Sequence, residues 1–313
     1  MTSEQITFLV FGIVLVVALI LDLGLLSKKS TTVSIKKALL QTILWVALAL
    51  LFFLFLWLQN GHVIAVEYLS AYLMEWSLSI DNIFIFILIF SFFGVKEKYY
   101  ARVLLIGILM AIVLRIVFIA IGIQLIERFH WLLYVFGAII LYTGIKMFMA
   151  KSNEEQDLSQ NRVYKFLIRF LPITTDESAG KFTLIKDGKR YYTSMFIVII
   201  MLATTDIIFA LDSIPAVFAI SQRPLVIYTS NVFAVLGLRS LFFLLRGAVN
   251  KFSYLQQGIA IVLIFIGLKM LAEIFDINVP VYISLLVIMV SIIASILYSM
   301  NRAKVEEQNN VAN

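Results

Sequence analysis

Nine apolar segments, each about as long as a membrane-spanning helix, follow one another along this chain of 313 residues. A helix that crosses the hydrocarbon core of a bilayer needs about 20 apolar residues, and its backbone polar groups must be hydrogen-bonded within the segment. We therefore expect an all-α, polytopic membrane bundle of about nine transmembrane helices. The segments lie at residues 6–26, 39–58, 67–93, 103–123, 131–149, 194–220, 226–246, 253–275 and 281–300.

Composition narrows the class further, because 62% of the residues are hydrophobic and only 14% are charged. Soluble domains average about 45–50% apolar and about 25% charged residues, so a large soluble catalytic domain is excluded. The chain has no cysteine, which excludes disulfides, thiolate nucleophiles, iron–sulfur clusters and zinc fingers. The first apolar segment has no basic stretch before it and no small-residue cleavage site after it, so we expect it to remain as a transmembrane helix.

The basic residues between the segments predict the orientation of the chain. Of 25 Lys and Arg residues, 19 lie in the loops and tail on one side of the membrane, whereas Arg128 and Arg223 lie on the other. The positive-inside rule then places the N-terminus outside and the C-terminus in the cytoplasm. Because the net charge of +6 comes mostly from these loops, it indicates no nucleic-acid partner.

The one long polar stretch, residues 150–193, is expected to be a cytoplasmic loop. Within it, residues 183–193 alternate around Asp187-Gly188, a pattern that predicts a β-hairpin with a type I′ turn. Two roles are open for the loop. It is either a solvated element whose basic residues fix the topology and touch anionic lipid, or a segment that binds a partner or regulates the protein.

Three motifs of the third to fifth segments recur in the same order in the sixth to eighth segments, at offsets of 131, 124 and 123 residues. Each copy has an odd number of segments, so the second copy must enter the bilayer upside down relative to the first, as in many secondary transporters. The matched motifs are Glu75-Trp-Ser-Leu-Ser-Ile-Asp81-Asn82 with Asp206-Ile-Ile-Phe-Ala-Leu-Asp212-Ser213, Leu114-Arg115 with Leu238-Arg239, and Gly144-Ile-Lys146-Met147 with Gly267-Leu-Lys269-Met270.

The repeat predicts how the bundle is divided. Two inverted three-helix repeats should meet near the middle of the membrane, where transporters of this architecture bind their substrates. The expected parts are two N-terminal transmembrane helices (1–60), the first inverted repeat (61–149), the cytoplasmic loop (150–193), the second inverted repeat (194–276), and the last transmembrane helix with a cytoplasmic tail (277–313).

Six ionisable residues lie well inside apolar segments and occur in both copies. Each would cost about 2.5–3.5 kcal/mol if it faced lipid at the middle of a helix, so we expect all six to face the interior or one another. Four acids and two arginines carry a formal charge of −2, which one divalent cation would neutralise. The six are Glu75, Asp81, Asp206, Asp212, Arg115 and Arg239.

Oxygen donors at and beside these acids form a candidate metal site. Carboxylate, amide and hydroxyl oxygens favour Mn²⁺, Ca²⁺ or Mg²⁺, and the two arginines would orient the carboxylates. In the alternative interpretation, the acids only neutralise the arginines in ion pairs that stabilise the bundle. The predicted ligands are Glu75, Asp81, Asn82, Asp206, Asp212 and Ser213.

Helix geometry restricts how the acids can share one ion. Residues six apart on a straight helix point in directions about 120° apart and differ by about 9 Å in height, so Glu75 and Asp81 cannot both chelate one ion. Either the helices unwind locally, as Ser77, Thr204 and Pro215 would allow, or the site is shared between the two copies.

Other residues receive simpler interpretations. Lys146 and Lys269 lie near segment ends and are expected to extend to the membrane surface. The Phe-rich runs at 52–53 and 92–93 are expected to face lipid, and Gly137 and Gly144 to allow close helix packing.

At its acidic motifs the sequence resembles the TerC family of integral membrane proteins, most closely its Alx-like branch. The resemblance also rests on Ser230-Asn231 and Arg239, and it covers about residues 5–300. It implies a bacterial inner-membrane protein that is related to the LysE transporter superfamily and linked to manganese export. It further implies that the acids of the third and sixth segments carry the metal function, and it adds Asn231 as a supporting residue.

Two functional hypotheses follow. The first is a divalent-cation transporter, a Mn²⁺ exporter working by alternating access, with protons as counter-ion and no tightly bound cofactor. The second is an accessory factor that delivers metal to exported enzymes through residues 150–193. We do not expect an enzyme, because an intramembrane aspartyl protease built on Asp81 and Asp212 would need a Gly-x-Gly-Asp motif, which the sequence lacks.

Overall fold

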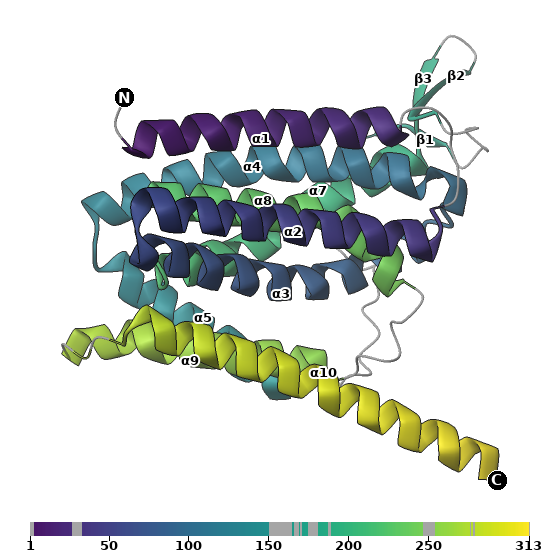
Figure 1. Cartoon of the computed structure of the whole chain (residues 1–313). Coiled ribbons are helices and arrows are strands. Elements are labelled where there is room, and N and C mark those ends of the chain that lie inside the picture. Colours follow the sequence, from purple (N-terminus) through teal and green to yellow (C-terminus); the bar gives the residue numbers. More distant parts are fainter. Residues whose placement is uncertain are drawn as a thin grey trace.

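The computed structural model describes residues 3–26, 33–149, 165, 169, 171–174, 181–186, 189–246, 254–275, 277 and 279–312. Long α-helices, each of 18 to 32 residues, make up most of this part of the chain (Figure 1). They are α1 (Ser3–Leu26), α2 (Ile35–Asn60), α3 (His62–Phe92), α4 (Tyr100–Arg128), α5 (Leu132–Met149), α7 (Ser194–Phe218), α8 (Pro224–Leu245), α9 (Leu255–Ala272) and α10 (Val281–Ala312).

Six helical stretches in the described residues are long and apolar enough to cross a membrane, so the protein is a multi-pass helical membrane protein. They correspond to α2, α4, α5, α8, α9 and α10. The predicted count of nine spans stays a prediction for α1, α3 and α7, of which α3 and α7 carry the four repeated acids.

Helix α8 lies at the centre of the bundle. In its most apolar window 94% of the residues are buried, against 22% in α10, which lies at the edge. Helix α3 packs on α8 and α4 packs on α7, while α2 covers both α3 and α8. Helices α5 and α9 pack along each other, with α10 beside α9 (Figure 1).

The prediction that glycines allow close helix packing is confirmed at Gly137 and Gly144, which lie against α9. A Cβ atom built on Gly144 would lie 2.8 Å from the backbone nitrogen of Ile264. On the facing helix, a Cβ on Gly267 would lie 2.7 Å from the backbone nitrogen of Leu141. The backbones of α5 and α9 therefore touch with no side chain between them.

The prediction that Phe52 faces lipid is wrong, whereas Phe92 is exposed as expected. Phe52 is buried, and its ring centroid lies 5.0 Å from that of Phe233 on α8 and 5.4 Å from that of Tyr68 on α3. The reason is the position of α2, which covers α3 and α8 with one face and leaves only the other face uncovered.

A small β-sheet precedes α7. Strands β2 (Thr183–Lys186) and β3 (Lys189–Thr193) pair antiparallel, in the register of the predicted hairpin, and the two turn residues, 187 and 188, lie outside the described residues. A third strand, β1 (Ile173–Thr174), pairs in parallel with β3 and was not predicted. The sheet lies at the end of the bundle where the C-terminus also lies, and the N-terminus lies at the other end (Figure 1).

The contact between α5 and α9 generates a prediction. Gly267→Ala should lower the free energy of unfolding by about 1–3 kcal/mol, because the added methyl group meets backbone atoms that cannot rotate away. Thermal unfolding of the purified protein in detergent measures the effect.

Gly12→Ala on α1 is the matched control, because nothing lies within 4 Å of the Cβ it would add. The control should unfold at or slightly above the wild-type temperature. Equal behaviour of the two variants would show that the close backbone contact does not limit stability.

Candidate functional site

An arginine of α4 lies in the middle of the bundle. Arg115 belongs to α4, whose neighbouring residues are apolar, and only 2% of its surface is exposed. Its side chain reaches residues of three other helices, α3, α7 and α8. A guanidinium group at this depth requires acceptors for its N–H groups and a compensating negative charge.

The acceptors come from both copies of the acidic motif. Arg115 donates from Nε to Asp206 Oδ2 at 2.9 Å and from Nη2 to Asp206 Oδ1 at 3.0 Å, a two-pronged arrangement that fits the planar fork of the guanidinium. It also donates from Nη1 to Glu75 Oε2 at 2.7 Å. Glu75 and Asp206, which occupy equivalent places in the two motifs, therefore meet on one cation.

An amide completes the cluster. Asn231 of α8 is fully buried; its Oδ1 accepts from Arg115 Nη1 at 2.7 Å, and its Nδ2 donates to Glu75 Oε1 at 3.1 Å. Asn231 thus contacts both the arginine and one of its acids. We call Glu75, Arg115, Asp206 and Asn231 the Arg115 cluster.

The charges of the cluster do not balance. Two carboxylates and one guanidinium leave a formal charge of −1 when all are ionised. Each carboxylate oxygen has an N–H donor within 3.1 Å, yet an oxygen with one donor keeps further capacity to accept. With all three groups ionised, the cluster is therefore buried and carries one excess negative charge.

A small cavity adjoins Asp206. It has room for about 10 Å³, roughly the volume that one water molecule needs, and it lies among Gly107 and Ala111 of α4, Leu202 of α7 and Leu238 of α8. Asp206 is the only ionisable residue among those described as lining it. One acidic residue of the cluster therefore lies beside a space of atomic size.

The two acidic helices are not unwound, and Glu75 and Asp206 from the two copies meet on Arg115. Helix α3 is continuous from His62 to Phe92, and α7 continues through Pro215 to Phe218. The hydroxyls of Ser77 and Thr204 donate to carbonyls of their own helix, Met74 O and Ile200 O, both at 2.7 Å. These bonds satisfy the hydroxyls without opening the helix.

Of the other four predicted ligands, the structure describes the side chains of two. Asp81 and Asp212 lie on α3 and α7, but their side chains are outside the described residues. Asn82 and Ser213 are buried, and Ser213 Oγ has no hydrogen-bond partner in the described part of the chain. Arg239, in the C-terminal third of α8, is also buried.

Among the described residues, no three His, Asp or Glu side chains are grouped so as to hold a metal ion. Glu75 and Asp206 do lie together, but with an arginine between them. A site with more carboxylates would have to include Asp81 or Asp212.

The prediction that Lys269 extends to the membrane surface is wrong, whereas Lys146 is exposed as expected. Lys269 is only 7% exposed, and its Nζ donates to Ala219 O at 2.9 Å and to Ser284 Oγ at 3.3 Å. The α7 helix ends beside Lys269 and offers an unpaired terminal carbonyl, which attracts the cation inward. The sequence repeat includes Lys269, but the sequence did not show that the end of α7 lies beside it.

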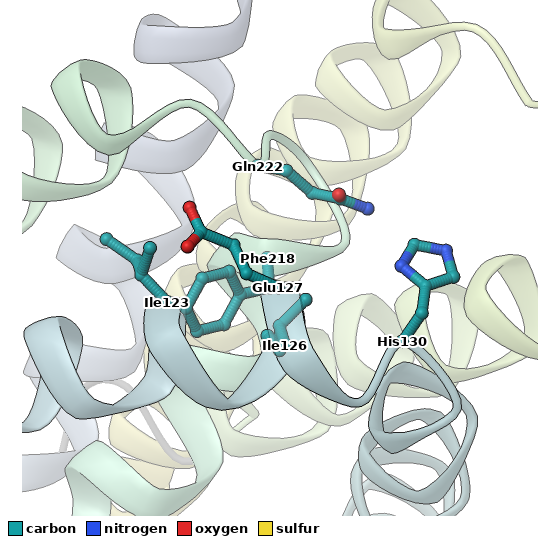
Figure 2. A pocket seen from close by; sticks show the side chains of 6 residues that line it. All are labelled: Ile123, Ile126, Glu127, His130, Phe218 and Gln222. Atoms are coloured by element: carbon teal, nitrogen blue, oxygen red, sulfur yellow. The ribbon is translucent and has the colours of Figure 1, made fainter.

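A second pocket lies where the end of α4 meets the connection from α7 to α8 (Figure 2). It has room for about 80 Å³, and Glu127, His130 and Gln222 line it together with Phe218. The three polar residues are exposed.

The charges of the Arg115 cluster predict an order of stability. Arg115→Met should lower the free energy of unfolding by about 3–5 kcal/mol, because it leaves two buried carboxylates without their cation. Asp206→Asn should cost less, about 1–3 kcal/mol, because the remaining arginine and Glu75 balance each other. Thermal unfolding in detergent, without added divalent cations, tests the order; an equal or reversed order would contradict the charge assignment.

Comparisons with known proteins agree with a membrane protein of bacterial type. A family model described as "Integral membrane protein TerC family" matches residues 60–307. An uncharacterized membrane protein of Myxococcus xanthus is 41% identical over 286 residues, which cover 91% of this chain and 89% of that protein. A Rickettsia felis membrane protein is 39% identical over 296 residues, 95% of this chain and 98% of its own.

A further relative carries a more specific name. The Salmonella typhi protein named "Putative membrane-bound redox modulator Alx" is 42% identical over 284 residues, which cover 88% of each chain. No solved structure matches the chain.

Proposed function

Because the chain belongs to the TerC family of integral membrane proteins, we propose that it transports a divalent metal ion across the membrane, with Mn²⁺ leaving the cytoplasm as the substrate. The observation that carries the proposal is the Arg115 cluster, a buried group of charges with one carboxylate in excess. Ionisable residues are costly inside a membrane protein, and they commonly mark the path of an ion.

The chemistry of the buried oxygens supports a hard divalent cation. Glu75 and Asp206 are described, and Asp81 and Asp212 lie six residues further along the same two helices, with Asn82 and Ser213 next to them. Carboxylate, amide and hydroxyl donors suit Mn²⁺, Ca²⁺ or Mg²⁺. We propose that these six residues form the ligand set and that Arg115, Arg239 and Asn231 support it.

The packing of the helices supports alternating access. The proposed units are α3 to α5 and α7 to α9. The first helix of each unit, which carries the acids, packs on the second helix of the other unit: α3 on α8, and α7 on α4. The third helices, α5 and α9, pack on each other. Two inverted units related by a twofold axis in the membrane plane would make these contacts, with their acids meeting on the axis.

We further propose that the protein lies in the cytoplasmic membrane of a bacterium, with its N-terminus outside. The position of the two termini at opposite ends of the bundle supports an odd number of spans (Figure 1). The LysE-superfamily relationship that the sequence resemblance implies would agree with transport.

The name of the Salmonella typhi relative, which describes a redox modulator, is compatible with this proposal. The chain has no cysteine and so cannot perform thiol–disulfide chemistry itself. An effect on redox state would reach the cell through the metal that the protein moves.

Transport is tested by loading proteoliposomes with Mn²⁺, Ca²⁺ or Mg²⁺ and following the movement of each ion. Asp81→Asn and Asp212→Asn should reduce Mn²⁺ flux at least tenfold while the purified variants remain folded, because each removes a charged ligand. Full flux in both variants would contradict the proposed ligand set.

Glu97→Gln serves as the control, since Glu97 is an exposed acid that pairs with Arg246 at the end of the bundle. Its flux should equal that of the wild type. Proton exchange is tested in the same vesicles: a pH gradient across the membrane should drive Mn²⁺ movement if protons are the counter-ion.

One observation favours the accessory role as a second candidate. Residues 171–193 form a three-stranded sheet in their described part, and Ile185 on β2 is 76% exposed. An exposed apolar side chain on a folded element suits contact with a partner protein. In this role Ile185→Asp should impair the loading of exported metalloenzymes in cells but leave flux in purified liposomes unchanged, whereas loss of both would point to misfolding.

A further inference from the structure

We propose that Arg115 and the transported cation compete for the same two carboxylates, so that the cation binds by displacing the guanidinium. This inference rests on the proposed function and concerns how the site takes up its substrate. Arg115 then acts as a cation tethered to the protein, which occupies the site until the substrate replaces it.

The hydrogen bonds place Arg115 where a metal ion would bind. The guanidinium spans both oxygens of Asp206 and one oxygen of Glu75, at distances from 2.7 to 3.0 Å. The fourth carboxylate oxygen accepts from Asn231. A divalent ion that joined Glu75 to Asp206 would need the space between them, which the guanidinium fills.

The charges favour exchange over simultaneous binding. Counted over Glu75 and Asp206 alone, the formal charge is −1 with Arg115, 0 with a divalent cation in its place, and +1 with both. All three side chains are at most 2% exposed, and like charges repel strongly at short distance in so dry a place. The arrangement with both cations on the carboxylates is therefore the least favourable of those that contain the metal.

The cavity beside Asp206 supplies a place for the first contact. It is lined by Gly107 and Ala111, which lie eight and four residues before Arg115 and so on the same face of α4. A cation in this space would lie beside Asp206, the one ionisable residue among those described as lining the cavity. Exchange can then begin at Asp206 before Glu75 is released.

Equilibrium binding of Mn²⁺ to purified Arg115→Gln protein in detergent tests the proposal. Removing the competing cation should tighten Mn²⁺ binding at least tenfold relative to the wild type, and Mn²⁺ should raise the unfolding temperature of the variant more than that of the wild type. Arg115→Lys keeps the charge without the planar fork, so its affinity should lie between the two. The lysine variant also serves if the glutamine variant does not fold.

Two controls assign the effect to the cluster. Arg223→Gln removes a half-exposed arginine at the start of α8 and should leave the affinity unchanged. Adding Asp206→Asn to Arg115→Gln should abolish the gain, because the tighter binding depends on that carboxylate.

The outcomes separate this inference from the proposed function. If the wild type transports Mn²⁺ but the folded Arg115 variants bind it no more tightly, or more weakly, Arg115 is a positioning residue and competition is wrong. If the wild type neither binds nor transports a divalent cation, the proposed function fails and the inference fails with it.

Discussion

The interaction on which the core of this bundle depends is the contact of one guanidinium with carboxylates from two helices. Glu75 and Asp206 could not be buried side by side without a cation, and Arg115 could not be buried without them. Asn231 adds a fourth helix to the same contact. Polar groups at this depth cannot be hydrated, so they depend on the hydrogen bonds within the cluster. The cluster therefore fixes the rotation and the height of α3, α4, α7 and α8 relative to one another.

Much of this could be read from the sequence, because charges inside apolar segments allow few arrangements. The repeated order of acid and arginine predicted that Glu75, Asp206 and Arg115 face the interior, and helix geometry admitted a site shared between the copies. The close contact of α5 with α9 was predicted in part, since glycine is the residue that lets two backbones touch. The hairpin was predicted because strand alternation and a two-residue turn are local signals.

The features that the sequence did not predict depend on contacts between segments that are distant in the sequence, or on which side of a helix faces lipid. Lipid and protein interior are equally apolar, so the pattern around Phe52 cannot tell which of the two its helix faces. Lys269 is held by the end of α7 and by a serine of α10, neither of which is near it in the sequence. Asn231 lacks a charge and a counterpart in the repeat motifs, so only the resemblance drew attention to it. The pairing of β1 with β3 joins segments that local patterning leaves unrelated.

The contact between α5 and α9 has a mechanical consequence. Where side chains separate two helices, rotamer changes let the helices slide, but at Gly144 and Gly267 the main chains meet directly and leave nothing to adjust. We therefore expect α5 and α9 to move together as one rigid unit. In the alternating access proposed above, α3, α4, α7 and α8 would rotate against this pair of helices, to which each of the two proposed repeats contributes one helix.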